Sequence, residues 1–136
     1  MALEATIEKV DMKRKRNCFH VMNYGRIPYD VHYILGVNGF TLDERNPARY
    51  QVTPSLGGSN PGLSVFIHRS VPNEFIEMVF YHELVEAELS LVDGIPRHEA
   101  HKKAIELESQ YVKRYYGDEK LERLKKWRVA TLEGYS

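Results

Sequence analysis

The stretch that decides the fold is VPNEFIEMVFYHELVEAELSLVDG, residues 71–94. Its apolar side chains recur three and four residues apart, which is the spacing of one face of an α-helix. Asn73 is the expected N-cap, because its side chain can accept a hydrogen bond from the first turn. Gly94 follows the last periodic residue, as is usual at a helix C-terminus. The sequence therefore predicts a helix from Asn73 to about Leu91 or Val92.

Two further helices are expected after this one. The first should begin near Pro96 and run to about Tyr116, with Gly117 as the stop signal. The second should run from Asp118 to about Leu132. Its apolar positions fall on one side and its lysines on the other, which indicates an amphipathic helix. The predicted buried face consists of Leu121, Leu124 and Trp127.

The strands are expected upstream of these helices. β-Branched and aromatic residues are concentrated in 18–24, in Asp30–Val37 and in Leu63–Arg69, and the last of these alternates like a half-buried strand. Residues 41–62 are rich in proline, glycine and asparagine and are predicted to form a loop. The expected fold class is α+β, with a small mixed or antiparallel sheet packed against the central helix and the C-terminal helices. Residues 1–136 are expected to form a single domain.

The composition excludes several kinds of site. The chain has 19 basic and 19 acidic residues, so a net charge of zero gives no overall attraction to nucleic acid or anionic membranes. Cys18 is the single cysteine, which rules out an internal disulfide and a site built from several thiolates. No apolar run approaches the about 20 residues of a membrane span, and the N-terminus does not look like a signal peptide. We expect a cytoplasmic protein without a membrane partner.

The residues that can carry chemistry lie within the first predicted helix and at the start of the second. His82 and Glu86 are four residues apart and project from one face, so an imidazole and a carboxylate can reach one cation. The next helix begins with His98-Glu99-Ala100-His101, and either histidine could supply a third ligand. Two imidazoles and one carboxylate form a known zinc ligand set with one open position.

His82-Glu83 and the helix around it resemble the active-site helix of zincin-like metallopeptidases, whose signature is His-Glu-x-x-His. The strand Ser64–Arg69 stands where the edge strand of that family precedes the helix, and a histidine-rich helix follows. The resemblance covers about residues 63–116 and departs at one position, where Glu86 replaces the second histidine. It implies that His82 and Glu86 are metal ligands, with His101 as the first choice for the third ligand and His98 as the second.

The resemblance also implies a reaction. Glu83 would be the general base, taking a proton from a metal-bound water that then attacks a peptide carbonyl. Zinc is the expected metal, and Glu86 in place of histidine shifts the preference somewhat towards iron(II) or manganese(II). The expected partner is a peptide or protein substrate.

Two alternatives to a hydrolase remain open at the level of sequence. One is a protein- or nucleic-acid-binding module on a degenerate metal-binding fold, and the other is a metalloprotein that does not hydrolyse its ligand. Basic and aromatic residues alternate in 111–128, which could contact nucleic acid, but the amphipathic helix accounts for them more simply. We therefore expect no nucleic-acid partner. The sequence predicts no oligomeric state.

Overall fold

The computed structural model describes residues 9–10, 19–22, 27, 30–38, 41–53 and 62–131. Its strands are β1 (Phe19–Met22), β2 (Asp30–Val37), β3 (Ala48–Thr53) and β4 (Gly62–His68). They form one sheet in the order β1-β2-β4-β3, in which β2 and β4 are parallel and the two outer pairs are antiparallel. The predicted α+β class with a mixed sheet is confirmed.

β4 occupies the inside of the sheet, where the resemblance to zincins had placed an edge strand. It pairs with β2 on one side and with β3 on the other. The prediction of a half-buried strand is also wrong, since both of its faces are covered. Ser64 and Phe66, on one face, are 9% and 7% exposed, and Leu63 and Val65, on the other, are fully buried.

β3 lies within the segment that we predicted to be a loop, so that prediction is wrong for Ala48–Thr53. Tyr50, Val52 and Thr53 have the β-branched and aromatic side chains typical of strands, but the prolines and glycines around them dominate the local pattern. Pairing with β4 supplies the hydrogen bonds that stabilise this short segment. β3 therefore lies at one edge of the described sheet, next to β4.

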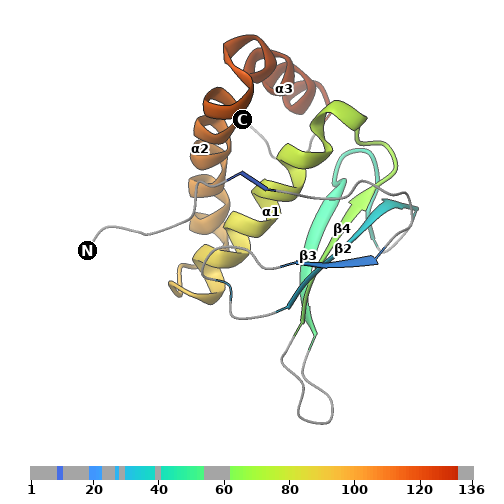
Figure 1. The fold of residues 1–136 in the computed structure, drawn as a ribbon, viewed down its shortest axis with the longest axis vertical. Coiled ribbons are helices and arrows are strands. Elements are labelled where there is room, and N and C mark those ends of the chain that lie inside the picture. The colour runs from blue at the N-terminus through green and yellow to red at the C-terminus, as the bar shows by residue number, and fades with distance from the viewer. Residues whose placement is uncertain are drawn as a thin grey trace.

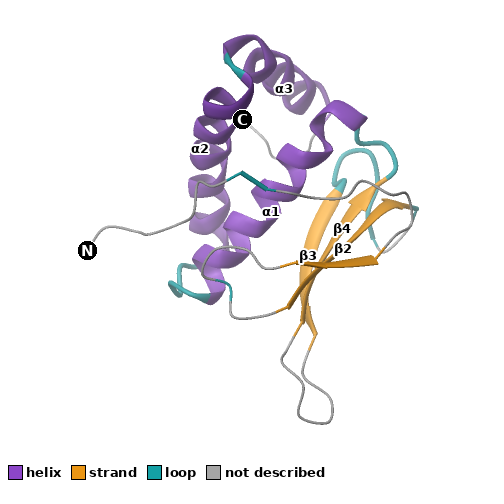
Figure 2. Ribbon diagram, viewed as in Figure 1, coloured by secondary structure: helices purple, strands orange, loops and turns teal. Residues whose placement is uncertain are grey.

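The helix α1 (Ile76–Leu91) lies between the sheet and the remaining helices, so that it forms a middle layer (Figures 1 and 2). It contacts β3 and β4 on one side and the next helix on the other. Thirteen of its 16 residues are buried, including those that a surface helix would expose. The polar side chains of a helix covered on all sides must find partners within the protein, because water does not reach them. The buried histidine and carboxylates of α1 are therefore its candidate functional residues.

The helix boundaries agree with the sequence predictions, except at the start of α1. A short 3-10 turn, η1 (Asn73–Phe75), precedes α1, and Pro72 is its N-cap residue without any side-chain cap. The prediction of Asn73 as N-cap is therefore wrong. Helices α2 (Arg97–Tyr116) and α3 (Asp118–Thr131) follow as expected, with Gly117 at a positive φ of 93° between them.

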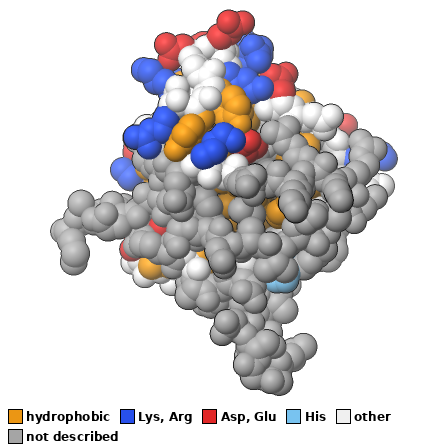
Figure 3. All heavy atoms as spheres, viewed as in Figure 1, with side chains coloured by type: hydrophobic (Ala, Val, Ile, Leu, Met, Phe, Trp, Pro, Cys, Tyr) orange, Lys and Arg blue, Asp and Glu red, His pale blue; other side chains and the backbone are white. Residues whose placement is uncertain are grey.

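Small residues allow α2 to approach α1 closely. Ala100 and Ala104 are fully buried, and the rings of Tyr81 and Tyr111 stack with their centroids 4.0 Å apart. In α3, Leu121 and Leu124 are buried, as the amphipathic prediction requires. Basic and acidic side chains are intermixed over the end of the molecule where α2 and α3 lie (Figure 3).

Several sequence interpretations concern residues outside the described part of the chain. Cys18 and residues 54–61 of the predicted loop are among these. Within the described residues, no helix is both long and apolar enough to cross a membrane.

A buried carboxylate on α1, that of Glu77, connects α1 with α2 and with the chain before β1. The hydroxyls of Tyr111 and Tyr116 donate to it at 2.6 and 2.7 Å, and Lys9 Nζ lies 3.1 Å away. The N–H of Val10 donates to the Tyr111 hydroxyl at 3.0 Å. Burial raises the pKa of Glu77, but these hydrogen bonds outweigh it and leave the pKa below its ordinary value.

Replacing Tyr111 with phenylalanine should destabilise the protein by about 1.5–3 kcal/mol at neutral pH, because a buried hydrogen bond to a charged acceptor is lost. The folded-state pKa of Glu77 is depressed from 4.5, so its stabilisation is present above that pH and is lost as the pH falls through the folded-state pKa. The difference in unfolding free energy between Tyr111→Phe and the wild type, measured in urea, should therefore be smaller below about pH 4 than at neutral pH.

Tyr116→Phe provides the comparison, because its hydroxyl donates to the same carboxylate from a residue that is 38% exposed. Tyr116→Phe should lower the free energy of unfolding by less than Tyr111→Phe does. A deficit of equal size at both pH values would contradict the role assigned to the Glu77 carboxylate.

Candidate metal centre

The α-helical spacing of α1 places His82 and Glu86 side by side. The two residues are 3% and 7% exposed, and His82 Nε2 lies 3.3 Å from Glu86 Oε2. The pair sits on the side of α1 that faces α2. Both groups are thus held in a protein environment where a charge must be compensated locally.

His101 from α2 completes the cluster. Its Nδ1 lies 3.1 Å from Glu86 Oε2 and 3.3 Å from His82 Nε2. The side chain of His101 is 42% exposed, so the cluster is buried on the α1 side and open to solvent on the α2 side. The three atoms form a group that could hold a metal ion.

The separations between these atoms suit coordination of one ion. Donors about 2.0–2.1 Å from a tetrahedral zinc stand about 3.4 Å apart. Donors on one face of an octahedral ion such as iron(II) stand about 3.0 Å apart. The observed separations of 3.1 to 3.3 Å lie between these two values, so the three donor atoms suit an ion of either geometry.

The other two residues that we predicted to take part lie outside this triangle. His98 is exposed on the first turn of α2, and the structure does not bring it to the cluster. Glu83 is half-buried beside His82, and the charges of His82, Glu86 and His101 are close enough to affect its pKa. Burial raises the pKa of Glu83 to about 7, where a carboxylate can exchange protons at neutral pH.

A buried charge pair stands behind His82. The Nδ1 atom of His82 lies 3.2 Å from Oε1 of Glu108, although the ring N–H is not well aligned for a hydrogen bond. Arg128 from α3 donates to both oxygens of Glu108, from Nε at 2.9 Å and from Nη2. A carboxylate next to one imidazole nitrogen favours the proton there and leaves the other nitrogen free to bind a metal.

The charges of the cluster are strongly coupled. Burial lowers the pKa of His82, but the carboxylates of Glu108 and Glu86 outweigh it and raise the pKa to about 9. Burial likewise raises the pKa of Glu86, and His101 and His82 lower it to about 2. Glu108 has a pKa below its ordinary value, because Arg128 and His82 outweigh its burial.

The raised pKa of His82 and the lowered pKa of Glu86 mean that a positive charge on His82 is stabilised by the neighbouring carboxylates. With His82 Nδ1 protonated towards Glu108, the lone pair of Nε2 faces the Glu86 carboxylate at 3.3 Å. Two acceptors at that distance repel each other unless a cation lies between them. A proton on His82 can meet this need, and so can a metal ion bound to all three atoms.

The sequence analysis did not identify Glu108, Arg128 or Arg97, whose Nε lies 4.0 Å from Glu86 Oε1. A helical signal for two of them exists, because Arg97, His101 and Glu108 lie within about 40° of one another at 100° per residue. This stripe of α2 faces the His82 side of α1. No such spacing signal links Arg128 to the site, since it reaches Glu108 only through the packing of α3 on α2.

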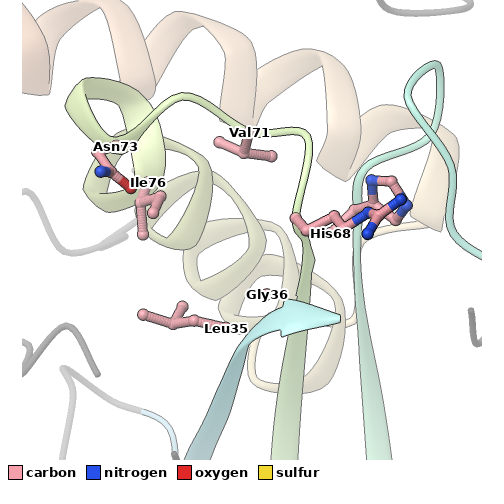
Figure 4. Close-up of a pocket in the computed structure, with 7 residues that line it drawn as sticks. Leu35, Gly36, His68, Val71, Asn73 and Ile76 are labelled. Carbon is pink, nitrogen blue, oxygen red and sulfur yellow. The ribbon is translucent and has the colours of Figure 1, made fainter. Parts of the chain in front are cut away.

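The structure also contains a cavity of about 220 Å³ that lies elsewhere, at the end of β2 and β4 and beside the start of α1 (Figure 4). Ile76 in its wall precedes His82 by six residues, or about 9 Å along the helix axis. None of the cluster residues lines it. The lining residues are Leu35, Gly36, His68, Arg69, Val71, Asn73 and Ile76.

Comparisons of the chain with models of known protein families, with curated proteins and with solved structures find no match.

Proposed function

We propose that this protein binds one divalent metal ion, zinc in the first instance, through His82 Nε2, Glu86 Oε2 and His101 Nδ1. The observation that carries the proposal is the mutual approach of these three atoms to 3.1–3.3 Å. The carboxylate of Glu108 behind His82 supports it, because metal-binding histidines regularly have such a partner. Iron(II) and manganese(II) are the alternative metals.

We further propose that the metal centre hydrolyses a carbonyl substrate, as in zincin-like peptidases. Three protein ligands leave a tetrahedral ion with one position for water. A zinc ion held there would lower the pKa of that water, and the Glu83 carboxylate, which is near enough for the charges of His82, Glu86 and His101 to affect it, would accept the proton. The half-exposed His101 leaves the open side of the cluster accessible from solvent.

A peptide is the substrate class that the surroundings favour. β3 is the edge strand of the described sheet, and it packs against α1. Its Tyr50 is near enough to Glu83 and Glu86 for their charges to affect its hydroxyl. An extended peptide can add to an edge strand through main-chain hydrogen bonds, which would carry a carbonyl past the metal. A cytoplasmic location, suggested by the single cysteine, also remains a proposal.

Replacing Glu83 with glutamine tests the hydrolytic part of this proposal. The amide keeps the size of the side chain but cannot accept the proton, so turnover of a peptide library should fall by about 10²–10⁴-fold. Zinc content, measured by elemental analysis, should be unchanged because Glu83 is outside the cluster. Glu99→Gln, at the exposed start of α2, is the matched control.

The outcomes separate the candidate functions. Undiminished turnover in Glu83→Gln would exclude Glu83 as the base. A wild-type protein that binds zinc but cleaves no peptide would be a metalloprotein without hydrolytic activity, and the metal-binding proposal would stand alone.

A further inference from the structure

Arg97 lies next to the cluster in a position that its own helix does not favour. It is the first residue of α2, and a cation at a helix N-terminus is opposed by the helix dipole. Its side chain is 67% exposed, so hydrophobic burial does not account for its placement either. The contacts that hold its guanidinium come from Tyr50 on β3 and Glu86 on α1.

The guanidinium of Arg97 is held on an aromatic platform. Its Cζ lies 4.7 Å from the centroid of the Tyr50 ring, within the range of a cation–π contact. Tyr50 is 7% exposed and its hydroxyl lies near Ser90, which donates to the carbonyl of Ile95 at 3.2 Å. The platform therefore fixes the arginine relative to both α1 and the turn before α2.

The pairing of Arg97 with Glu86 is too weak to occupy the guanidinium. Its Nε lies 4.0 Å from Glu86 Oε1, the oxygen that does not face the two histidines. An exposed pair at this distance contributes little stability. A guanidinium has five N–H donors in a fork that matches a carboxylate. This one lies 4.0 Å from the carboxylate of the cluster, one turn before the half-exposed His101 on α2.

We propose that Arg97 recognises an anionic group, most simply a carboxylate, on the ligand that binds the metal centre. This inference rests on the proposed metal function and extends it to the class of substrate. The metal would take the carbonyl or other donor group, while Arg97, on its Tyr50 platform, would hold a carboxylate a few bonds away. A peptide whose terminal carboxylate or acidic side chain lies close to the scissile bond has this chemistry.

The test compares two hydroxamates of equal chain length, one ending in a carboxylate and one in a neutral amide, binding to the zinc-loaded protein by calorimetry. The hydroxamate chelates zinc in both, so the difference reports the distal group. The carboxylate form should bind about tenfold more tightly, as a hydrogen bond to a charged group allows. Arg97→Gln should abolish this difference while the zinc content and the affinity for the neutral probe stay the same.

Arg123→Gln is the control, because it removes an exposed arginine that pairs with Glu74 on another part of the surface. It should keep the tenfold preference. Equal binding of the two probes to the wild-type protein, or a preference that survives Arg97→Gln, would overturn the inference and leave the metal site intact. If neither probe binds and no zinc is retained, the proposed metal function itself fails, and the inference fails with it.

Discussion

Replacing His82 with alanine should abolish stoichiometric zinc binding. The loss of affinity should exceed the 10–100-fold that removal of an outer partner of a ligand costs, because a ligand itself is removed. His82 is 3% exposed, so this change also leaves Glu86 and Glu108 without their shared partner and should lower stability. The measurement is zinc per chain after dialysis, together with competition against a chelator.

His101→Ala separates metal binding from folding. Its side chain is 42% exposed, so the variant should fold normally and yet lose zinc as His82→Ala does. His98→Ala is the matched control three residues earlier, on the same helix but outside the cluster, and should keep full zinc binding. If His98→Ala lost zinc and His101→Ala kept it, the third ligand would be His98, and the geometry described above would be wrong.

Replacing Arg128 with methionine should destabilise the folded protein by about 3–5 kcal/mol, since it removes the arginine from a buried ion pair and leaves the Glu108 carboxylate with His82 alone. The side chains of Arg128 and Glu108 are 5% and 1% exposed, so water cannot compensate the remaining carboxylate. Chemical denaturation of the metal-free protein would measure the loss. Arg123→Met, which breaks an exposed pair on the same helix, should cost no more than about 1 kcal/mol.

The double variant Glu108→Gln with Arg128→Met should recover part of the stability, because no unpaired charge stays buried. Its zinc affinity should still be about 10–100-fold weaker, since His82 loses the carboxylate that orients it. A double variant with the zinc affinity of the wild type would show that Glu108 contributes to stability alone.

The helices could be predicted because their signals are local. The spacing of apolar residues and the glycines at 94 and 117 give the ends of α1 and α2 nearly to the residue. β3 was missed because the prolines and glycines on either side of it dominate the local pattern, although its antiparallel partner β4 is the next strand in the sequence. The inner position of β4 escaped prediction because it depends on parallel pairing with β2, which is remote in sequence.

The candidate site shows the same division. His82 and Glu86 are four residues apart, so helix geometry alone predicts that they share a face. The structure groups His101, and not His98, with them. The support from Glu108 and Arg128 depends on how α2 and α3 pack, and the platform of Arg97 depends on the unpredicted β3. Packing between elements is what sequence periodicity does not contain.

Metal binding by His82, Glu86 and His101 is tested most directly by a crystal structure of the zinc-loaded protein, with anomalous data collected on both sides of the zinc absorption edge. We expect one zinc ion about 2.0–2.2 Å from His82 Nε2, His101 Nδ1 and Glu86 Oε2, with a water in the fourth position. No anomalous peak within this triangle, after zinc, iron and manganese have each been supplied, would contradict it.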